Sequence, residues 1–187
     1  MGVLKINNGN FCTNDNQWSD FPIAANSINI NPVIVKPDYG SICADAFGYC
    51  FDPAETETVY FSIQMPHSWN METNIRPAIH WMPQTASVGS VLFGFTYRLG
   101  NVDGSFSAAT TITSLATATA NDNKHLLTTF SLVSMAGYTL STIMLCSLSR
   151  YGNGSGDDYP SDIGLLNFDL YYKQDCVGTC SLTCKGW

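Results

Sequence analysis

The histidines are the first residues to examine for chemistry, because two of the three lie in one short stretch, MPHSWNMETNIRPAIHWMP, at residues 65–83. Pro66 ends one predicted strand and a second strand follows the turn, so His67 and His80 are expected to face each other across neighbouring strand ends. Such a pair needs a third protein ligand to hold a metal. The candidates for that ligand are His125, Glu57 and Glu72. The alternative is that these histidines only hydrogen-bond locally.

A second candidate site is the acidic, glycine-rich segment YGNGSGDDYPSD. Asp157 and Asp158 in this segment resemble the oxygen ligands of a calcium loop. The other oxygen donors there are Asp162, Asn153 and Ser155. No glutamate closes the segment as in an EF-hand, so an acidic turn between two strands is the alternative. Arg150 ends the preceding strand and is expected to pair with one of the carboxylates.

The seven cysteines are many for a protein made in a cytoplasm, and an odd number leaves at least one unpaired or bonded to another chain. The tail DCVGTCSLTCKGW has C-x3-C-x3-C spacing, which differs from the C-x2-C pairs of zinc ribbons. Three interpretations stay open: disulfides from the tail to the first part of the chain, bridges between identical chains, and free thiols. The cysteines considered for disulfides are Cys12, Cys43, Cys50, Cys176, Cys180 and Cys184.

The composition argues against several classes of partner. The net charge is −7 and there is no basic run, so binding to nucleic acid is not expected. No apolar run reaches the roughly 18 residues of a membrane span, and the N-terminus lacks the apolar stretch of a secretory signal. We therefore expect synthesis in a cytoplasm and no contact with a membrane. Only 12% of the residues are charged, which is typical of a protein buried in an assembly or of a hardy extracellular domain.

The elements that position these side chains are predicted to be strands. Apolar and polar residues alternate in five runs, which are TVYFSIQM, SVLFGFTYRL, HLLTTFSLVSM, STIMLCSLSR and LLNFDLYY. Alternation rich in β-branched and aromatic residues indicates half-buried strands, and polar turns separate the runs. With the weaker run ATTITSLATATA, we expect seven or eight strands. The predicted fold class is all-β, an antiparallel two-sheet sandwich of jelly-roll type, because several loops are too long for simple hairpins.

The chain is expected to divide into three parts. Residues 1–55, rich in Asn, Asp, Pro and Gly, are predicted to form an extended N-terminal arm with a strand or two. The alternative for this part is an irregular region folded over its own sandwich. Residues 56–175 are predicted to form the β-sandwich, and residues 176–187 a Cys-rich C-terminal tail.

The run FDPAETETVYFSIQMPHSWNMETNIRPAIHWMP resembles a group of tailed-bacteriophage and prophage proteins associated with virions. Their pattern is an aromatic-Asp start, a strand F-x-x-Q-x-P-H-S, a turn, and P-H-x-H-W. The pieces FGFTYRLG, LSRYG and LLNFDLYY continue the resemblance, which covers roughly residues 50–173. Ala78 stands where the group has its first histidine, which argues against a metal at His80. The resemblance implies a jelly-roll protein of the capsid-cement or fibre type, commonly a trimer.

Two functional hypotheses follow from the resemblance and the composition. The first is a capsid cement or decoration protein that sits as a homotrimer on the major capsid protein and stabilises the head of a tailed phage. The alternative is a head-fibre or tail-fibre knob that binds host-surface carbohydrate, with Trp69 and Tyr159 stacking on sugar rings. A hydrolase that uses His67 or His80 with an aspartate is disfavoured, because no nucleophile or cofactor motif is present. We therefore expect a virion protein without enzymatic activity and without a cofactor.

Overall fold

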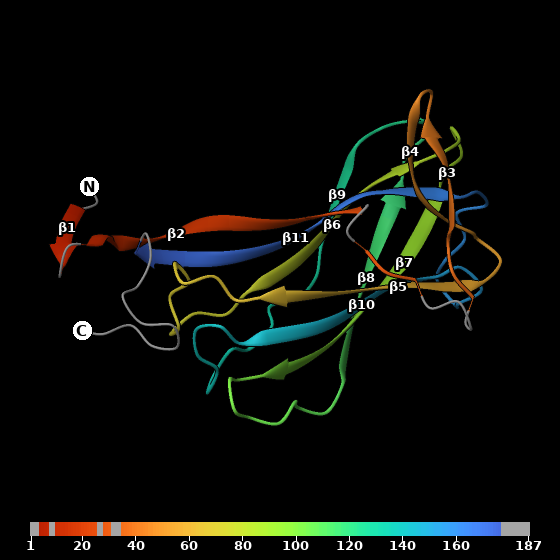
Figure 1. Ribbon diagram of the computed structural model, residues 1–187. Coiled ribbons are helices and arrows are strands. Elements are labelled where there is room, and N and C mark those ends of the chain that lie inside the picture. The colour runs from red at the N-terminus through yellow and green to blue at the C-terminus, as the bar shows by residue number, and fades with distance from the viewer. Residues whose placement is uncertain (1–3, 8–9, 26–27, 31–34, 177–187) are drawn as a thin grey trace.

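The protein folds as two antiparallel β-sheets packed face to face, as the computed structural model in Figure 1 shows. The structure describes residues 4–7, 10–25, 28–30 and 35–176, and for residues 4–7, 10–16 and 176 it describes the backbone only. The described part contains no helix that is long and apolar enough to cross a membrane. The prediction of an all-β two-sheet sandwich is confirmed.

The larger sheet has seven strands in the described part of the chain, with β11 at its centre. Along one edge of β11, β4 pairs with Ile163 and Gly164 and β2 pairs from Asn167 to Cys176. β6 pairs with the other edge. β1 extends the sheet from β2, β3 from β4, and β9 from β6. These strands are β1 (Leu4–Asn7), β2 (Asn10–Ala24), β3 (Asp38–Cys43), β4 (Ala46–Phe51), β6 (Arg76–Pro83), β9 (Leu126–Thr129) and β11 (Ile163–Cys176).

The smaller sheet has four strands in the order β5-β10-β7-β8. Its members are β5 (Thr56–Gln64), β7 (Gly89–Gly100), β8 (Thr110–Ala118) and β10 (Ile143–Tyr151). The central strand β10 pairs with β5 from Ile143 to Tyr151 and with β7 from Ile143 to Arg150, without a register shift. This sheet is therefore regular along its whole length.

The strand order is that of a jelly roll. If β2 and β5 to β11 are counted as eight strands in chain order, the first sheet contains strands 1-8-3-6 and the second strands 2-7-4-5. Such interleaving of the two sheets distinguishes a jelly roll from a stack of simple hairpins. β3 and β4 are then a hairpin inserted between the first and second strands.

Alternating apolar residues from both sheets meet in one core. Phe61 of β5 and Phe95 of β7 contact Phe168 of β11, with ring centroids 4.7 and 5.1 Å from the Phe168 ring. All three side chains are buried, as is Trp81, which lies edge-on to Phe93 at 5.5 Å. Offset and edge-on aromatic contacts of this kind bind the two sheets together.

The structure differs from the prediction that residues 1–55 are an arm outside the sandwich. β2, the first strand of the jelly roll, lies in this stretch and pairs with β11 from Asn167 to Cys176. Ile23 and Phe51, from β2 and β4, are buried in the core. The apolar pieces of this stretch are short, so the sequence does not show that long-range pairing makes them sheet strands.

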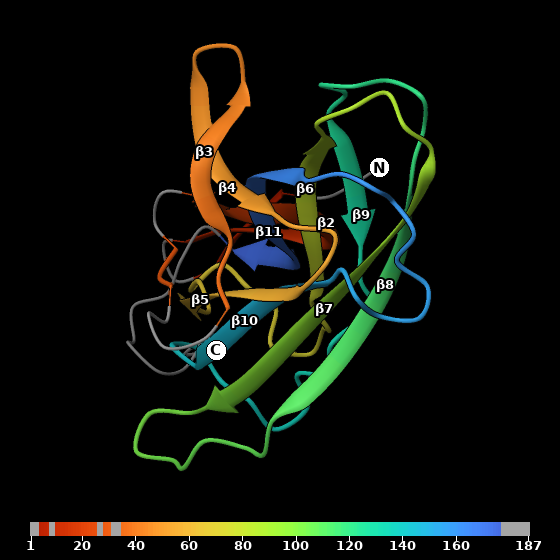
Figure 2. The ribbon, with the colours of Figure 1, turned by 90° about the vertical axis from the view of Figure 1, so that its right-hand side faces the viewer.

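The β3–β4 hairpin projects from one end of the sandwich (Figures 1 and 2). One face of the hairpin packs on the larger sheet, where Ile42 and Cys50 form a small cluster with Met82. Gly164 of β11 lies beneath it, and a Cβ there would be 2.9 Å from the Ile42 Cγ2 atom. The absence of a side chain at Gly164 therefore lets the hairpin approach the sheet closely.

Candidate functional site

His80 lies on the outer face of β6 and joins a chain of three polar side chains. Its Nε2 atom is 2.7 Å from Oδ2 of Asp169 on β11, and its Nδ1 atom is 2.6 Å from Nε2 of His125. Asp169 is buried and also accepts a hydrogen bond from the side-chain amide of Asn167. Because an ionised carboxylate only accepts hydrogen bonds, the Nε2–H group of His80 donates to Asp169, and one proton is shared between Nδ1 of His80 and Nε2 of His125. The carboxylate thus orients both imidazoles.

His67 takes no part in this chain, so the prediction that His67 and His80 face each other is wrong. His67 follows β5 and has its Nε2 atom 3.0 Å from the Ser141 hydroxyl, whereas His80 lies in the opposite sheet. The turn after Pro66 carries the chain from one sheet to the other, which sequence periodicity does not reveal. No group of three or more metal-ligating side chains occurs among the described residues, so neither Glu57 nor Glu72 completes a metal site with the histidines.

Arg150 and Asp157 form an ion pair inside the protein, as the sequence predicts for Arg150. The Arg150 Nη2 and Nε atoms donate to the two Asp157 oxygens at 2.8 and 3.0 Å. The other N–H groups of Arg150 donate to the carbonyls of Phe51, Tyr159 and Ser161. All five guanidinium N–H groups are therefore satisfied, and the pair fastens the 157–161 segment to the end of the sandwich.

The proposed calcium ligands have other roles. The Asp157 carboxylate is bound to Arg150 and also accepts from the backbone N–H of Leu92. Asp158 accepts from the backbone N–H of Ser90. Both carboxylates thus hold the segment against β7 and do not converge on a common point, so the acidic turn is the correct alternative.

Trp69 and Tyr159 are both buried, and the prediction that they stack on sugars is wrong. Trp69 donates its indole N–H to the carbonyl of Thr73. The Tyr159 hydroxyl donates to the carbonyl of Thr85 and accepts from its N–H. Each segment folds back on the sandwich because its aromatic side chain is apolar enough to be drawn into the core and has a polar atom with a partner there.

The cysteines divide into three groups. Cys43, Cys50 and Cys146 are free, and burial raises the pKa of the Cys50 and Cys146 thiols. Cys12 on β2 lies directly opposite Cys176 on β11 in the backbone register. Cys180 and Cys184 lie outside the described residues, so the proposed bridges between identical chains stay a prediction.

Two carboxyl groups, those of Glu57 and Asp162, have raised pKa values. Burial raises the pKa of Glu57, and nearby Asp52 and Asp38 raise it further, although a hydrogen bond from the Asp52 N–H opposes the shift. Burial also raises the pKa of Asp162, again with a contribution from Asp52. Arg150 lies opposite Glu57 in the sheet register, but its N–H groups point to Asp157 and to carbonyls. This end of the sandwich is therefore acidic and incompletely neutralised.

The β3–β4 hairpin carries aromatic residues on the face opposite Ile42 and Cys50, a feature that sequence analysis missed. Tyr49 on this face is half-buried against the core and donates its hydroxyl to the Ile28 carbonyl at 3.4 Å. Tyr39 pairs with Tyr49 and Ser41 with Phe47 across the hairpin, so these four side chains share one face. Tyr39 and Phe47 are 60% and 61% exposed. The alternation of DYGSIC and AFGYCF puts the aromatic residues on the side opposite Ile42 and Cys50, but Phe51 on that same side is buried in the core, so the alternation alone does not show that Tyr39 and Phe47 are exposed.

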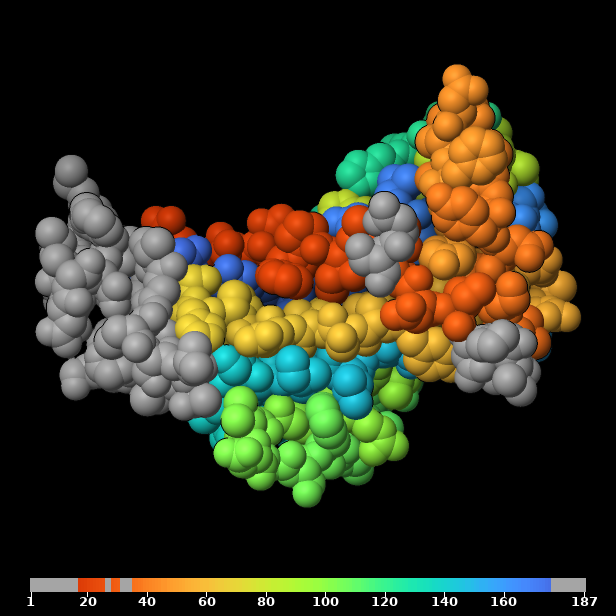
Figure 3. All heavy atoms as spheres, viewed as in Figure 1, coloured from red at the N-terminus to blue at the C-terminus, as the bar shows by residue number. Residues whose placement is uncertain are grey.

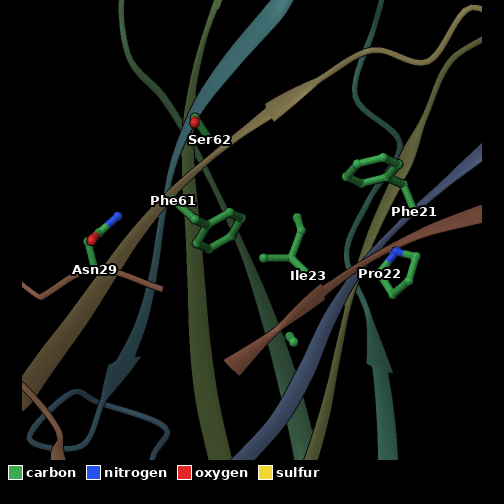
Figure 4. A pocket seen from close by; sticks show the side chains of 7 residues that line it. Phe21, Pro22, Ile23, Asn29, Phe61 and Ser62 are labelled. Atoms are coloured by element: carbon green, nitrogen blue, oxygen red, sulfur yellow. The ribbon is translucent and has the colours of Figure 1, made fainter. Parts of the chain in front are cut away.

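A groove of about 360 Å³ lies between β2 and β5, at one open side of the sandwich. Figure 4 shows Phe21, Ile23 and Phe61 pointing toward it, with Asn29 and Ser62 at its rim. Asn29 is paired with Tyr60 of β5 through two backbone hydrogen bonds of 2.7 and 2.8 Å. The chain itself thus covers part of this edge of the smaller sheet.

The fold and these surfaces define a jelly-roll β-sandwich protein. Comparisons with known proteins do not assign it to a family. No protein-family model and no curated protein matches the sequence. Among solved structures, the chain is similar to a chain in the structure of the Gx strain of infectious bursal disease virus. The two chains share 14% sequence identity and have a TM-score of 0.41, and the match covers 91% of this chain and 37% of the viral one. It is also similar to the VP2 subviral particle of this virus, with 12% identity and a TM-score of 0.41 over 93% and 38%.

A protein of another kind shows a similar degree of likeness. Dimeric latent PorU from Porphyromonas gingivalis has 10% identity and a TM-score of 0.39, over 84% of this chain and 13% of that one. The chain spans less than two fifths of each of these three proteins. With TM-scores of 0.41, 0.41 and 0.39, these likenesses leave the function to be inferred from the chain itself.

Proposed function

We propose that this protein is a structural protein of a virion, of the cement or decoration type, which binds the major capsid protein of a tailed phage and has no catalytic role. The resemblance of residues 50–173 to phage virion proteins motivates the proposal. The observation that carries it is the exposed aromatic face of the projecting β3–β4 hairpin, with Tyr39 and Phe47 at its centre. Clustered aromatic side chains on a projecting element are typical of a surface that is buried in an assembly.

The hairpin is suited to act as a rigid anchor. Ile42 and Cys50 on its inner face hold it on the sheet, so little conformational entropy is lost when the outer face binds. Figure 3 shows the tip of the hairpin rising above the rest of the surface, where a neighbouring subunit can reach it. The few hot-spot residues of an interface, among which Tyr is enriched, each cost about 2 kcal/mol or more of binding free energy when truncated. Many such contacts around a head would oppose the pressure of packaged DNA.

The experiment compares virus particles with and without this protein. We expect particles that lack it to release DNA at a lower temperature. A double variant, Tyr39→Ser and Phe47→Ser, should add to such particles poorly and fail to restore heat stability. Leu145→Ser is the matched control, because Leu145 is an exposed apolar residue on β10, away from the hairpin. Equal heat stability with and without the protein would refute the cement role.

The alternative function is a fibre knob that binds host-surface carbohydrate. The aromatic face of the hairpin favours this function, since flat exposed rings also stack on sugars. This face, and not the buried Trp69 and Tyr159, would then be the sugar-binding surface. Copy number separates the two functions. Hundreds of copies per particle support the cement protein, whereas a few tens, with loss of host attachment in the hairpin variant, support the knob.

A further inference from the structure

β8 is an open edge of the smaller sheet. It pairs with β7 at nine successive positions, from Tyr97↔Thr110 to Gly89↔Ala118, with no register shift. On its other side no strand of the described chain pairs with it. Figure 2 shows β8 at the margin of the sheet, with β7 as its inner neighbour. An edge of this length leaves a row of backbone N–H and C=O groups available to another strand.

β8 lacks the features by which edge strands usually avoid pairing. Its sequence, TTITSLATA, contains no charged residue, no proline and no bulge. Soluble proteins normally protect a long edge with at least one of these. Other edges of this protein are protected: Asn29 occupies part of the β5 edge, β3 carries a bulge near Cys43, and β9 is only four residues long.

An uncharged groove adjoins this edge. It lies between β8 and β9, has a volume of about 320 Å³, and none of its lining residues is charged. Leu115 and Leu127, on its two sides, are 59% and 52% exposed. The Ser114 hydroxyl donates to the carbonyl of Thr129 across it, which fixes the spacing of the two strands. A strand added to β8 would bury apolar side chains against this groove.

We propose that β8 pairs antiparallel with β8 of a second copy of this chain, about a twofold axis. The chain has a net charge of −7, so two copies repel each other over most of their surfaces. β8 is a long edge at which identical strands meet without opposing like charges. Antiparallel pairing also makes the contact self-complementary, as a twofold interface requires. The two four-stranded sheets then form one continuous sheet, and this inference does not depend on the proposed capsid role.

The test measures the mass of the purified protein by light scattering over a wide range of concentration. Thr113→Lys puts a charge on an exposed position of β8, near the proposed axis, where the two copies bring like charges together. We expect this variant to have half the wild-type mass at concentrations where the wild-type chains, of 20.4 kDa each, are paired. Ser62→Lys is the matched control, because it puts the same charge on an exposed position of β5, at the opposite edge of the same sheet. It should keep the wild-type mass.

Hydrogen exchange supplies a second measurement that does not need a variant. Amides of residues 110–118 should exchange more slowly in concentrated than in dilute wild-type protein, while those of β10 should not change. A wild-type protein of single-chain mass at all concentrations overturns the proposal. So does equal mass for wild type and Thr113→Lys, equal loss of mass in both lysine variants, or protection on association at another strand.

Discussion

Arg150 and Asp157 are joined by two hydrogen bonds of 2.8 and 3.0 Å, with 0% and 1% of their side-chain surfaces exposed. They are seven residues apart in the chain, and the pair also reaches the carbonyls of Phe51, Tyr159 and Ser161. It thereby links the hairpin, the acidic segment and β10 at one end of the jelly roll. The guanidinium group of Arg150, and not a bound calcium ion, therefore holds the acidic segment in place.

Arg150→Met is therefore expected to lower the free energy of unfolding by about 3–5 kcal/mol, because Asp157 is left buried without its partner. Urea unfolding followed by circular dichroism measures this loss. Arg98→Met is the control, since Arg98 is exposed and donates to the Ser107 carbonyl, and it should change stability by about 0.5 kcal/mol or less. Equal losses in the two variants would contradict the role of the buried pair.

Glu57→Gln is expected to make stability less dependent on pH. The pKa of Glu57 is raised in the folded protein above its ordinary value of 4.5. Its contribution to stability is therefore fully present below the unfolded pKa and is lost as pH rises through the folded pKa. The amide cannot ionise, so the variant does not lose this contribution as the pH rises. The melting temperature of the variant minus that of the wild type should therefore increase from pH 4 to pH 8.

The control for this pH series is Glu55→Gln, because Glu55 is exposed and only two residues away. Its difference from the wild type should stay constant over the same pH range. A constant difference for Glu57→Gln as well would show that burial of this carboxyl does not govern the pH response.

Gly164→Ala should destabilise the packing of the β3–β4 hairpin on the larger sheet. The added methyl group would lie 2.9 Å from Cγ2 of Ile42, so either the hairpin or β11 must shift. Overpacking of this kind costs about 1–3 kcal/mol. Thermal unfolding measures the loss, and Gly104→Ala is the control, since its Cβ would meet no atom closer than 3.4 Å. The hairpin model fails if both alanine variants melt like the wild type.

Native alkylation should distinguish the free cysteines. Cys43 is exposed and should react with iodoacetamide in the folded protein. Cys50 and Cys146 should react only after unfolding, because burial raises their pKa and keeps them protonated as well as covered. Peptide mass mapping after timed labelling gives the three rates. Labelling of Cys146 as fast as Cys43 would contradict the burial described here.

Cys12 and Cys176 should form a disulfide when oxidised glutathione is added. They are directly opposite each other on β2 and β11. Opposed residues of antiparallel strands have Cα atoms about 4.5–5.5 Å apart, within the range of about 4.4–6.8 Å that a disulfide bridges. Peptide mapping without reductant should detect the link in the wild type. Cys12→Ser should lose it, and linkage of Cys176 to Cys43 instead would refute this pairing.

The sequence by itself determined the fold class. Alternation in runs such as TVYFSIQM and LLNFDLYY is a local property, because successive side chains of a strand point to opposite faces. It therefore predicted an all-β sandwich, which the structure confirms, and in the structure Phe61 and Phe168 of these two runs face the core. The pairing of Arg150 with a nearby carboxylate was predictable for the same reason, since the two are close in the chain.

Only the tertiary structure decided which distant residues meet. His80 finds Asp169, 89 residues away, and His125, 45 residues away, because β6 lies between β11 and β9. The prediction for His67 failed because the chain changes sheets after Pro66, and the prediction for residues 1–55 failed because pairing with β11 adds β2 and β4 to the sheet. Strand alternation records which face a side chain occupies but carries no information on which strand lies beside it. That neighbour is set by long-range backbone pairing and burial, and it decides which side chains form a site.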